Sequence, residues 1–261
     1  MTSSSVPMYA SYPSLVDRTV FITGGADGIG AELVGQFTRQ GSKVAFVDKN
    51  VEYATETVRR CVEAGAKHAP LFYGVDLIDI EALRAACAAA VEALGSVTVL
   101  VNNAANDDRH SWDEVTPEYF DNRINTNLRH YFFAIQALAP QMIEAGSGSI
   151  VNVGSSSYMM KEDFFPGYAI AKSAVEGITR TMARTFGAHG IRVNTVVPGW
   201  VPTERQLTKW WTAEGEAQTM GDQVIKRRIL PAEFAQMVLF LAADDGGGCC
   251  AQEFIVDGGR F

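Results

Sequence analysis

The chain has 261 residues, 47% of them hydrophobic, and a formal net charge of -8 at pH 7. This length suits one large α/β domain or two small ones, and the apolar share suffices for a substantial core. The acidic balance, without a long basic run, argues against nucleic acid and anionic membrane surfaces as partners. No apolar run is long enough to span a bilayer. Residues 1–15 lack the apolar segment of a secretory signal, so we expect a loose arm there.

The cysteines and histidines indicate neither a disulfide framework nor a metal site. Cys61, Cys87, Cys249 and Cys250 form no C-x-x-C motif, and the adjacent pair could not easily close on itself. This usage fits a reduced, cytoplasmic compartment. The four histidines show no metal-ligand spacing, so we predict no metal. The sequence suggests no role for Cys249 and Cys250.

The first element with chemical meaning is a glycine-rich turn. Residues 18–23 read as a strand, and a helical pattern follows over 31–40. Between them, the glycines have the spacing G-x-x-x-G-x-G, which lets a backbone approach a pyrophosphate at a helix N-terminus. Such a turn can also be only a turn, but its place between strand and helix favours nucleotide binding. The residues expected to contact the nucleotide here are Gly24, Asp27, Gly28, Ile29 and Gly30.

Asp48 ends the next strand, over 43–47, and indicates which nucleotide binds. It lies 18 residues after Gly30, close to the place of a carboxylate that holds ribose hydroxyls. A 2'-phosphate there would meet a like charge that costs about 4 kcal/mol. We therefore predict NAD rather than NADP, and Asp27 in the glycine turn favours the same choice. The alternative is an ordinary strand-end acid in solvent.

The chain then alternates between helix and strand. We expect helices over 51–64 and 79–94, and strands over 69–74 and 97–101. Two strand ends carry candidate cofactor contacts. Asp76, followed by Leu77, either accepts a hydrogen bond from the adenine amino group or caps a turn. Asn103 and Ala104 stand where backbone would pass a ligand, although Asn103 could equally tie neighbouring strands together.

The stretch around Tyr168 predicts a site that removes a proton from an alcohol. Tyr168 and Lys172 are four residues apart, which places them on one face of a helix. Ser155 follows a buried strand over 149–154 and could face the phenol. Using a phenol as a base near neutrality needs a pKa shift of about 3 units, or about 4 kcal/mol. An ammonium about 4 Å away supplies that much. The alternative is packing beside a solvated amine.

The remaining elements complete a single domain. They are a helix over 116–145 that carries Asn125 and Asn127, the Tyr168 helix to about 189, a strand over 192–197, a polar and aromatic segment over 201–228, a helix over 231–243 and a strand over 252–256. No linker or repeat divides the series. Strands that alternate with helices predict an α/β fold with a doubly wound parallel sheet over 16–261.

Together these residues resemble the short-chain dehydrogenase/reductases over about 16–259. The resemblance implies a Rossmann fold with strand order 3-2-1-4-5-6-7 and a homotetramer with interface helices near 116–145 and 168–187. It implies that Tyr168 is the general base and that Ser155 positions the substrate. Lys172 would bind the ribose and lower the tyrosine pKa, and Asn127 would hold a water. Ala105 and Gly154 are mild departures from the family pattern.

The resemblance also completes the expected cofactor site. With Pro198 and Gly199 after the strand over 192–197, it comprises Gly24, Asp27, Gly28, Ile29, Gly30, Asp48, Asp76, Leu77, Asn103, Ala104, Tyr168, Lys172, Pro198, Gly199 and Val201.

A narrower resemblance, carried by 106–110, 127–130 and 206–218, is to bacterial sugar dehydrogenases of the xylose-dehydrogenase type. It implies oxidation of the anomeric hydroxyl of an aldose with NAD, beneath a lid over 201–228. The tryptophans at 210 and 211 would stack on a sugar or pack the lid. The expected substrate contacts are Asn106, Asp107, Arg109, His110, Ser155, Ser157, Tyr168, Trp200, Arg205 and Gln206.

Three alternatives stay open. The cations Arg205, Lys226, Arg227 and Arg228 could bind the carboxylate of a keto-deoxy sugar acid, or could be a solvated face. A non-catalytic NAD-binding protein would be expected to lack one of the serine, tyrosine and lysine. A general alcohol or steroid dehydrogenase would need an apolar pocket for its apolar substrate, whereas the loop at 106–111 is strongly polar.

Overall fold

The protein is described here by a computed structural model, which describes residues 9–261. Parallel strands form one seven-stranded sheet in the order β3-β2-β1-β4-β5-β6-β7, which confirms the predicted order. The strands are β1 (Thr19–Thr23), β2 (Lys43–Asp48), β3 (Leu71–Gly74), β4 (Val99–Asn102), β5 (Gly148–Val153), β6 (Ile191–Pro198) and β7 (Glu253–Val256). β1, β4 and β5 are buried along their whole length, as expected of parallel strands covered on both faces.

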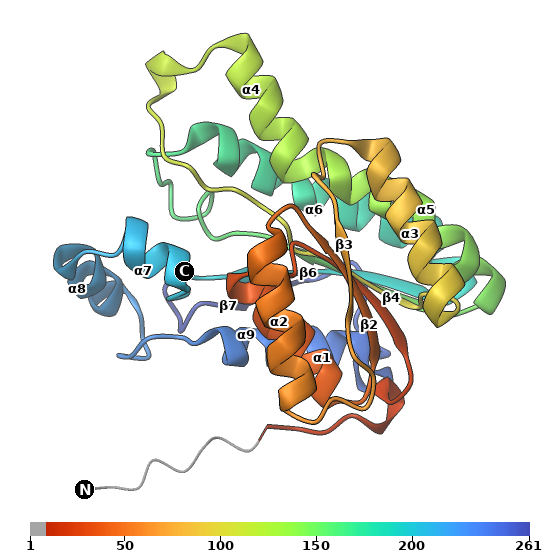
Figure 1. Ribbon diagram of the computed structural model, residues 1–261. Coiled ribbons are helices and arrows are strands. Elements are labelled where there is room, and N and C mark those ends of the chain that lie inside the picture. The colour runs from red at the N-terminus through yellow and green to blue at the C-terminus, as the bar shows by residue number, and fades with distance from the viewer. Residues whose placement is uncertain (1–8) are drawn as a thin grey trace, which may run out of the picture.

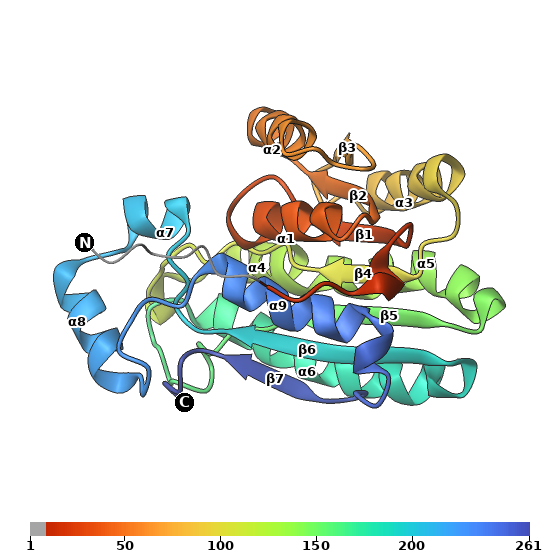
Figure 2. The same ribbon diagram turned by 90° about the horizontal axis from the view of Figure 1, so that it is seen from below.

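Helices cover both faces of the sheet and extend beyond one end of it (Figures 1 and 2). The helices are α1 (Gly28–Arg39), α2 (Val51–Glu63), α3 (Ile80–Leu94), α4 (Pro117–Ile124), α5 (His130–Ala145), α6 (Pro166–Phe186), α7 (Glu204–Lys209), α8 (Ala213–Asp222) and α9 (Pro231–Ala242). Helices α1, α2 and α9 share one core cluster with the sheet, and α3, α5 and α6 share the other. This is a single doubly wound domain.

The predicted helix over 116–145 is not one regular helix. α4 and α5 are joined by a π-helical segment, Asn125–Arg129. Within it, the Asn127 side chain donates to the carbonyl of Arg123 at 3.0 Å, so a side chain occupies a backbone acceptor one turn back. Short π segments interrupt α-helices most often at functional sites.

The predicted loose arm over 1–15 is too long. Residues 1–8 lie outside the described part of the chain, but 9–15 pack against the body. Leu15 is fully buried in the core, in a short 3-10 helix, Pro13–Leu15. The Tyr12 amide donates to the Gln40 side chain at 2.8 Å. The reason is physical: Leu15 fits an apolar cluster that the local sequence does not reveal.

The segment over 201–228 folds as two short helices, α7 and α8, set beyond the carboxyl ends of the strands (Figure 2). The lid is defined here as residues 201–228. Within 9–261, no helix is long and apolar enough to cross a bilayer. The same range contains no group of three or more His, Cys, Asp or Glu side chains arranged to hold a metal ion.

Candidate active site

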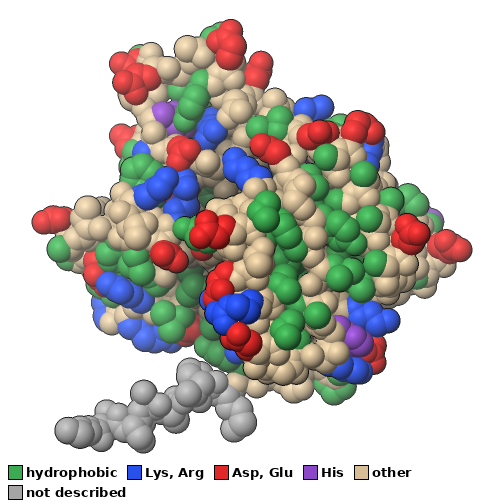
Figure 3. Space-filling model, viewed as in Figure 1, with side chains coloured by type: hydrophobic (Ala, Val, Ile, Leu, Met, Phe, Trp, Pro, Cys, Tyr) green, Lys and Arg blue, Asp and Glu red, His purple; other side chains and the backbone are tan. Residues whose placement is uncertain are grey.

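A cavity of about 1080 Å³ lies between the carboxyl ends of the strands and the lid. It opens where the strand order reverses between β1 and β4, the usual binding position in open α/β sheets. Of the predicted site residues, all but Asn127 and His110 line it. Acidic and basic side chains are interspersed over this face of the molecule (Figure 3).

The glycine turn after β1 forms a cradle that admits no side chain. Gly24 has a φ of +69°, and a Cβ on Gly30 would stand 1.7 Å from the Gly24 carbonyl oxygen. Asp27 caps α1, because its carboxylate accepts from the Gly28 amide at 2.6 Å. The close backbone approach and the free amides of the first helical turn fit the pyrophosphate of a dinucleotide.

Asp48 and Asp76, which follow the glycine turn in the sequence, fit contacts with the ribose and the adenine of a dinucleotide. Asp48 accepts from the amides of Ala26 at 3.1 Å and Asn50 at 3.0 Å, which hold its carboxylate at the cavity wall. A fixed carboxylate there suits ribose hydroxyls. Asp76 is exposed and accepts from the Ile78 amide at 3.1 Å, so it caps a turn at the cavity edge. Both alternatives weighed for Asp76 remain compatible with this position.

Asn103 has the structural role that the sequence left open. Its side chain donates to the carbonyls of Thr23 at 3.1 Å and Gly24 at 2.8 Å, and its amide donates to the Thr23 hydroxyl at 3.0 Å. The ends of β1 and β4 are thereby tied together. Because Asn103 and Ala104 also line the cavity, this tie fixes the wall that a cofactor would contact.

Ser155 and Tyr168 meet at the cavity wall, from the end of β5 and the first turns of α6. The Ser155 hydroxyl donates to the Ser157 hydroxyl at 3.0 Å and accepts from the Ser157 amide at 3.2 Å. The pKa of Tyr168 lies well above its usual value of 10 because the phenol is buried, although its hydrogen bond with Ser155 opposes this rise. In the protein alone, burial therefore outweighs the lowering that we expected from Lys172.

Lys172 is buried and bound by groups that the sequence analysis did not identify. Its ammonium donates to the Val153 carbonyl and to the Tyr131 hydroxyl, both at 2.7 Å. Burial lowers the pKa of Lys172 to about 7. The ammonium stands 5.9 Å from the centroid of the Tyr168 ring. Tyr131 lies four residues after Asn127, and the sequence analysis did not single it out because its contact with Lys172 joins segments 41 residues apart.

Asn127 is fully buried and does not line the cavity, but its side chain binds the backbone of the loop over 106–110. Its side-chain oxygen Oδ1 accepts from the backbone amide of Asn106 at 2.7 Å, while its side-chain nitrogen Nδ2 donates to the backbone carbonyl of Arg123. It therefore fixes the point where the polar loop over 106–110 begins. A water held by Asn127 stays a prediction.

His110 does not line the cavity, and its expected role as a substrate contact stays a prediction. Its Nε2 accepts from the Gly167 amide at 3.1 Å, and its Nδ1 lies 3.0 Å from the Asp108 carbonyl oxygen. Since α6 has no side-chain cap of its own at Phe165, His110 caps the helix that carries Tyr168. The sequence contained no signal for this contact, because it joins segments 57 residues apart.

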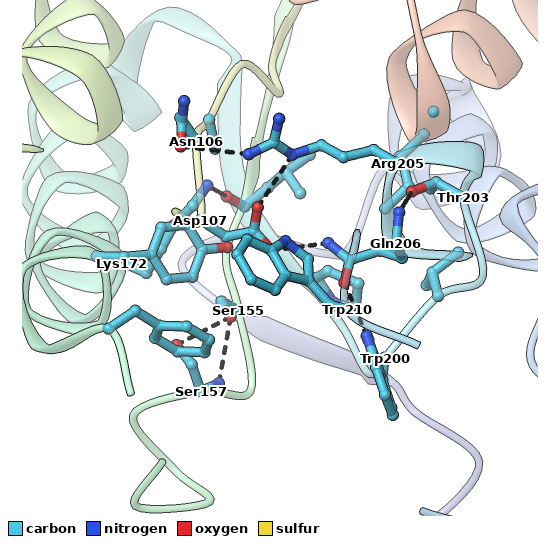
Figure 4. A pocket seen from close by; sticks show the side chains of 18 of the residues that line it. Asn106, Asp107, Ser155, Ser157, Lys172, Trp200, Thr203, Arg205, Gln206 and Trp210 are labelled. Atoms are coloured by element: carbon cyan, nitrogen blue, oxygen red, sulfur yellow. Dashed lines mark hydrogen bonds and ion pairs between the residues drawn. The ribbon is translucent and has the colours of Figure 1, made fainter. Parts of the chain in front are cut away.

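Ion pairs and hydrogen bonds connect the loop after β4 to the lid. Arg205 in α7 forms ion pairs with Asp107 at 3.3 Å and Asp108 at 2.6 Å. Gln206 donates to Asp107 at 2.7 Å and accepts from the Trp200 indole at 2.8 Å. Figure 4 shows Arg205 and Gln206 reaching from the lid side to Asp107. We call Asp107, Asp108, Arg205 and Gln206 the latch.

Of the four cations considered for binding a carboxylate, Arg205, Arg227 and Arg228 are paired with acids and Lys226 donates to the Gly221 carbonyl at 2.8 Å, which argues against a cationic lid that awaits a carboxylate. Arg227 binds Glu233 at 2.6 Å and Arg228 binds Glu216 at 2.6 Å, and neither arginine lines the cavity. Arg205 is engaged by the latch. The two adjacent tryptophans of the lid divide their roles: Trp211 stacks on Trp200 at 4.3 Å, whereas Trp210 lines the cavity.

Comparisons with known proteins agree with this geometry. A family model described as enoyl-(acyl carrier protein) reductase matches residues 24–260. The chain is 46% identical over 253 residues to D-xylose 1-dehydrogenase of Caulobacter vibrioides, covering 96% of this chain and 98% of that one. It is 44% identical over 252 residues to a probable galactose dehydrogenase of Rhizobium meliloti, covering 97% and 98%.

Among solved structures, a short-chain dehydrogenase/reductase from Serratia marcescens is 31% identical, with a TM-score of 0.86, covering 95% of this chain and 99% of that one. A putative short-chain alcohol dehydrogenase from Sinorhizobium meliloti is 27% identical, with a TM-score of 0.89, covering 95% and 98%.

Proposed function

Because the chain belongs to the short-chain dehydrogenase/reductase family, a family of nicotinamide-dependent oxidoreductases, we propose that it oxidises the anomeric hydroxyl of a neutral aldose with NAD to the aldonolactone. The observation that carries this proposal is the cavity whose wall combines Ser155 and Tyr168 with Asp107, Arg205 and Gln206 of the latch. The Nε of Arg109 and the Nε1 of Trp210 in this wall are buried without an acceptor within residues 9–261, and an apolar alcohol would leave them unpaired. Relatives named for xylose and galactose support an aldose.

The residues divide the reaction between them. Ser155 would hold the reacting oxygen, and Tyr168 would take the hydroxyl proton. The bound nicotinamide would accept the hydride and add a positive charge that favours the phenolate. That charge matters because burial alone holds the pKa of Tyr168 above its usual value. Lys172 would donate to the cofactor ribose from its anchored position between Val153 and Tyr131.

The first test is formation of reduced cofactor with purified protein and NAD across pentoses, hexoses, 6-deoxy sugars and keto-deoxy sugar acids. We expect turnover with at least one neutral aldose. Tyr168→Phe should abolish turnover yet bind NAD with nearly unchanged affinity. Activity confined to sugar acids would contradict the aldose proposal, and bound NAD without any turnover would contradict catalysis itself.

NAD rather than NADP follows in this proposal from Asp48. Its carboxylate, held by two backbone amides, would oppose a 2'-phosphate by about 4 kcal/mol. Asp48→Ala should therefore lower the ratio of kcat/KM for NAD to that for NADP by at least about 10-fold. The measurement is the initial rate with each cofactor at saturating sugar. An unchanged ratio would remove Asp48 from this role.

We further propose a cytoplasmic homotetramer that uses the helices near 116–145 and 168–187. In support, Phe120, Phe132 and Ile170 expose 37%, 40% and 49% of their surface on α4, α5 and α6. Apolar side chains of this size are typical of subunit contacts when they gather on neighbouring elements. Light scattering of the purified protein measures the mass directly, and a monomeric mass would contradict the proposal.

A further inference from the structure

The guanidinium of Arg109 lies at the cavity wall and has no polar partner in the described part of the chain. Its Cζ stands 3.9 Å from the centroid of the Phe164 ring, 5.0 Å from Trp210 and 5.4 Å from Phe165. Within residues 9–261, Arg109 makes no side-chain hydrogen bond or ion pair, and its Nε is buried without an acceptor. A guanidinium stacked on a ring keeps its N–H groups in its own plane, where the ring cannot accept them.

Trp210 presents a second unpaired donor beside the first. Its indole Nε1 is buried without an acceptor among residues 9–261, and the side chain lines the same cavity from the lid (Figure 4). The neighbouring tryptophans differ, because the indoles of Trp200 and Trp211 donate to Gln206 at 2.8 Å and Glu216 at 2.9 Å. Buried donors without acceptors are rare in native proteins, and each one calls for an explanation.

The two unpaired donors lie beside each other, and Arg109 lies close to the reacting centre. The Phe165 ring, which Arg109 approaches, is 5.2 Å from the Tyr168 ring in an edge-to-face contact. Arg109 therefore stands one side chain away from the proposed base. A small ring whose C1 hydroxyl meets Tyr168 would bring its more distant oxygens toward Arg109 and Trp210.

The charges around Arg109 favour neutral oxygens over a carboxylate. The acids that act on it are Asp107 and Glu162, whose charges oppose the lowering of the Arg109 pKa by burial without cancelling it. Each acid is also held by another arginine, Asp107 by Arg205 at 3.3 Å and Glu162 by Arg260 at 3.4 Å. Both acids would repel an anionic ligand in this confined space, whereas neutral hydroxyl or ring oxygens would not be repelled.

We propose that Arg109 and Trp210 form a donor pair, one from the body and one from the lid, that binds oxygens of the sugar remote from C1. This inference rests on the proposed aldose oxidation and names the contacts that select the sugar. Because one donor belongs to the lid, a sugar with the correct distant hydroxyls binds both parts at once. A sugar that lacks one of these hydroxyls leaves a buried donor unpaired and is rejected.

The test uses two conservative variants and a matched control in the full-length enzyme. Trp210→Phe keeps the aromatic ring but removes the N–H. Arg109→Lys keeps the charge but removes the planar fork. Trp211→Phe makes the same change as Trp210→Phe in the adjacent residue, whose N–H is bonded within the lid. Fluorescence titration with NADH shows whether each variant folds and binds cofactor.

The readout is kcat/KM for the best aldose and for its analogues that each lack one hydroxyl away from C1. We expect Trp210→Phe to lose about 5- to 10-fold and Arg109→Lys about 10- to 100-fold on the parent sugar, chiefly through KM. Each loss should shrink to less than about 2-fold on one particular deoxy analogue. Trp211→Phe should keep the wild-type discrimination between parent and analogues.

The outcomes separate this inference from the proposed function. Wild-type turnover of an aldose, with losses equal for the parent and every analogue, would overturn the donor pair alone. Losses confined to carboxylated sugars would also overturn it, since Arg109 would then bind an anion. Absence of wild-type turnover on every aldose would overturn the proposed function, and the donor pair with it.

Discussion

Lys172 and Tyr131 share the carbonyl oxygen of Val153 at a buried position in the wall of the cavity. The ammonium and the phenol both donate to that oxygen, at 2.7 and 2.9 Å, and the ammonium also donates to the phenol. Both side chains are at most 1% exposed. A lysine in such a place is held in one conformation, but its charge is expensive because water is excluded.

This cost predicts a pH-dependent stability in the cofactor-free protein. The folded-state pKa of Lys172, about 7, lies below its ordinary value of 10.5. Between these values the unfolded chain binds more protons, so stability rises with pH and falls as pH drops toward 7. Wild type should gain on the order of 2 kcal/mol relative to Lys172→Met between pH 7 and pH 9.

The measurement is urea unfolding of both proteins at each pH. Lys172→Met is the matched control, because it keeps the length of the side chain and removes the titrating group. Parallel pH profiles in the two proteins would show that Lys172 keeps its ordinary pKa in the folded state.

Single residues were predictable from the sequence where spacing along one element carried the signal. The pair Tyr168 and Lys172 is an example, because four residues make one helical turn. His110 and Tyr131 were not predictable, since each acts through a contact between distant segments. Arg109 was expected at the substrate, but its lack of a partner is visible only in three dimensions.

At the scale of elements, the lid depends on a few charged contacts with the body. α7 has 6 residues, which is less than two turns and too short to be stable by itself. Arg205 connects it to the loop after β4 through Asp107 and Asp108. These side chains are partly exposed, so the energy of each ion pair is small, and the lid can open for exchange of substrate and product.

Arg205→Gln should therefore loosen the lid without touching the proposed base. We expect KM for the sugar to rise about 5- to 20-fold, with a smaller change in kcat. Arg228→Gln, which breaks a comparable pair with Glu216 inside the lid, is the control and should change KM less. Steady-state kinetics of both variants decide the matter: equal effects would mean that the latch has no special role.

The elements themselves were predictable to within a few residues where apolar periodicity or a buried run marked them. The π-helical interruption between α4 and α5 was not predictable, because the hydrogen bond from the Asn127 side chain to the Arg123 carbonyl forms only in the folded protein. The lid helices were also missed. They are short and mostly polar, and their helical form depends on caps such as Thr203 and Thr212.

At the scale of the whole molecule, the sheet order determines where chemistry occurs. The strand order reverses between β1 and β4, and the glycine turn and the Asn103 loop diverge there to form the cavity. The alternation of apolar strands with amphipathic helices was enough to predict this arrangement. The position of the lid was not predictable in the same way, since it depends on the latch between segments about 100 residues apart.

The most direct test of the central claim is the formation of NADH from the best aldose compared with its methyl glycoside, in which the C1 hydroxyl is blocked. The site described here predicts rapid reduction of NAD by the free sugar and none by the glycoside, because Tyr168 would have no proton to remove at C1. Equal rates with both sugars would show that another hydroxyl is oxidised and would contradict the account.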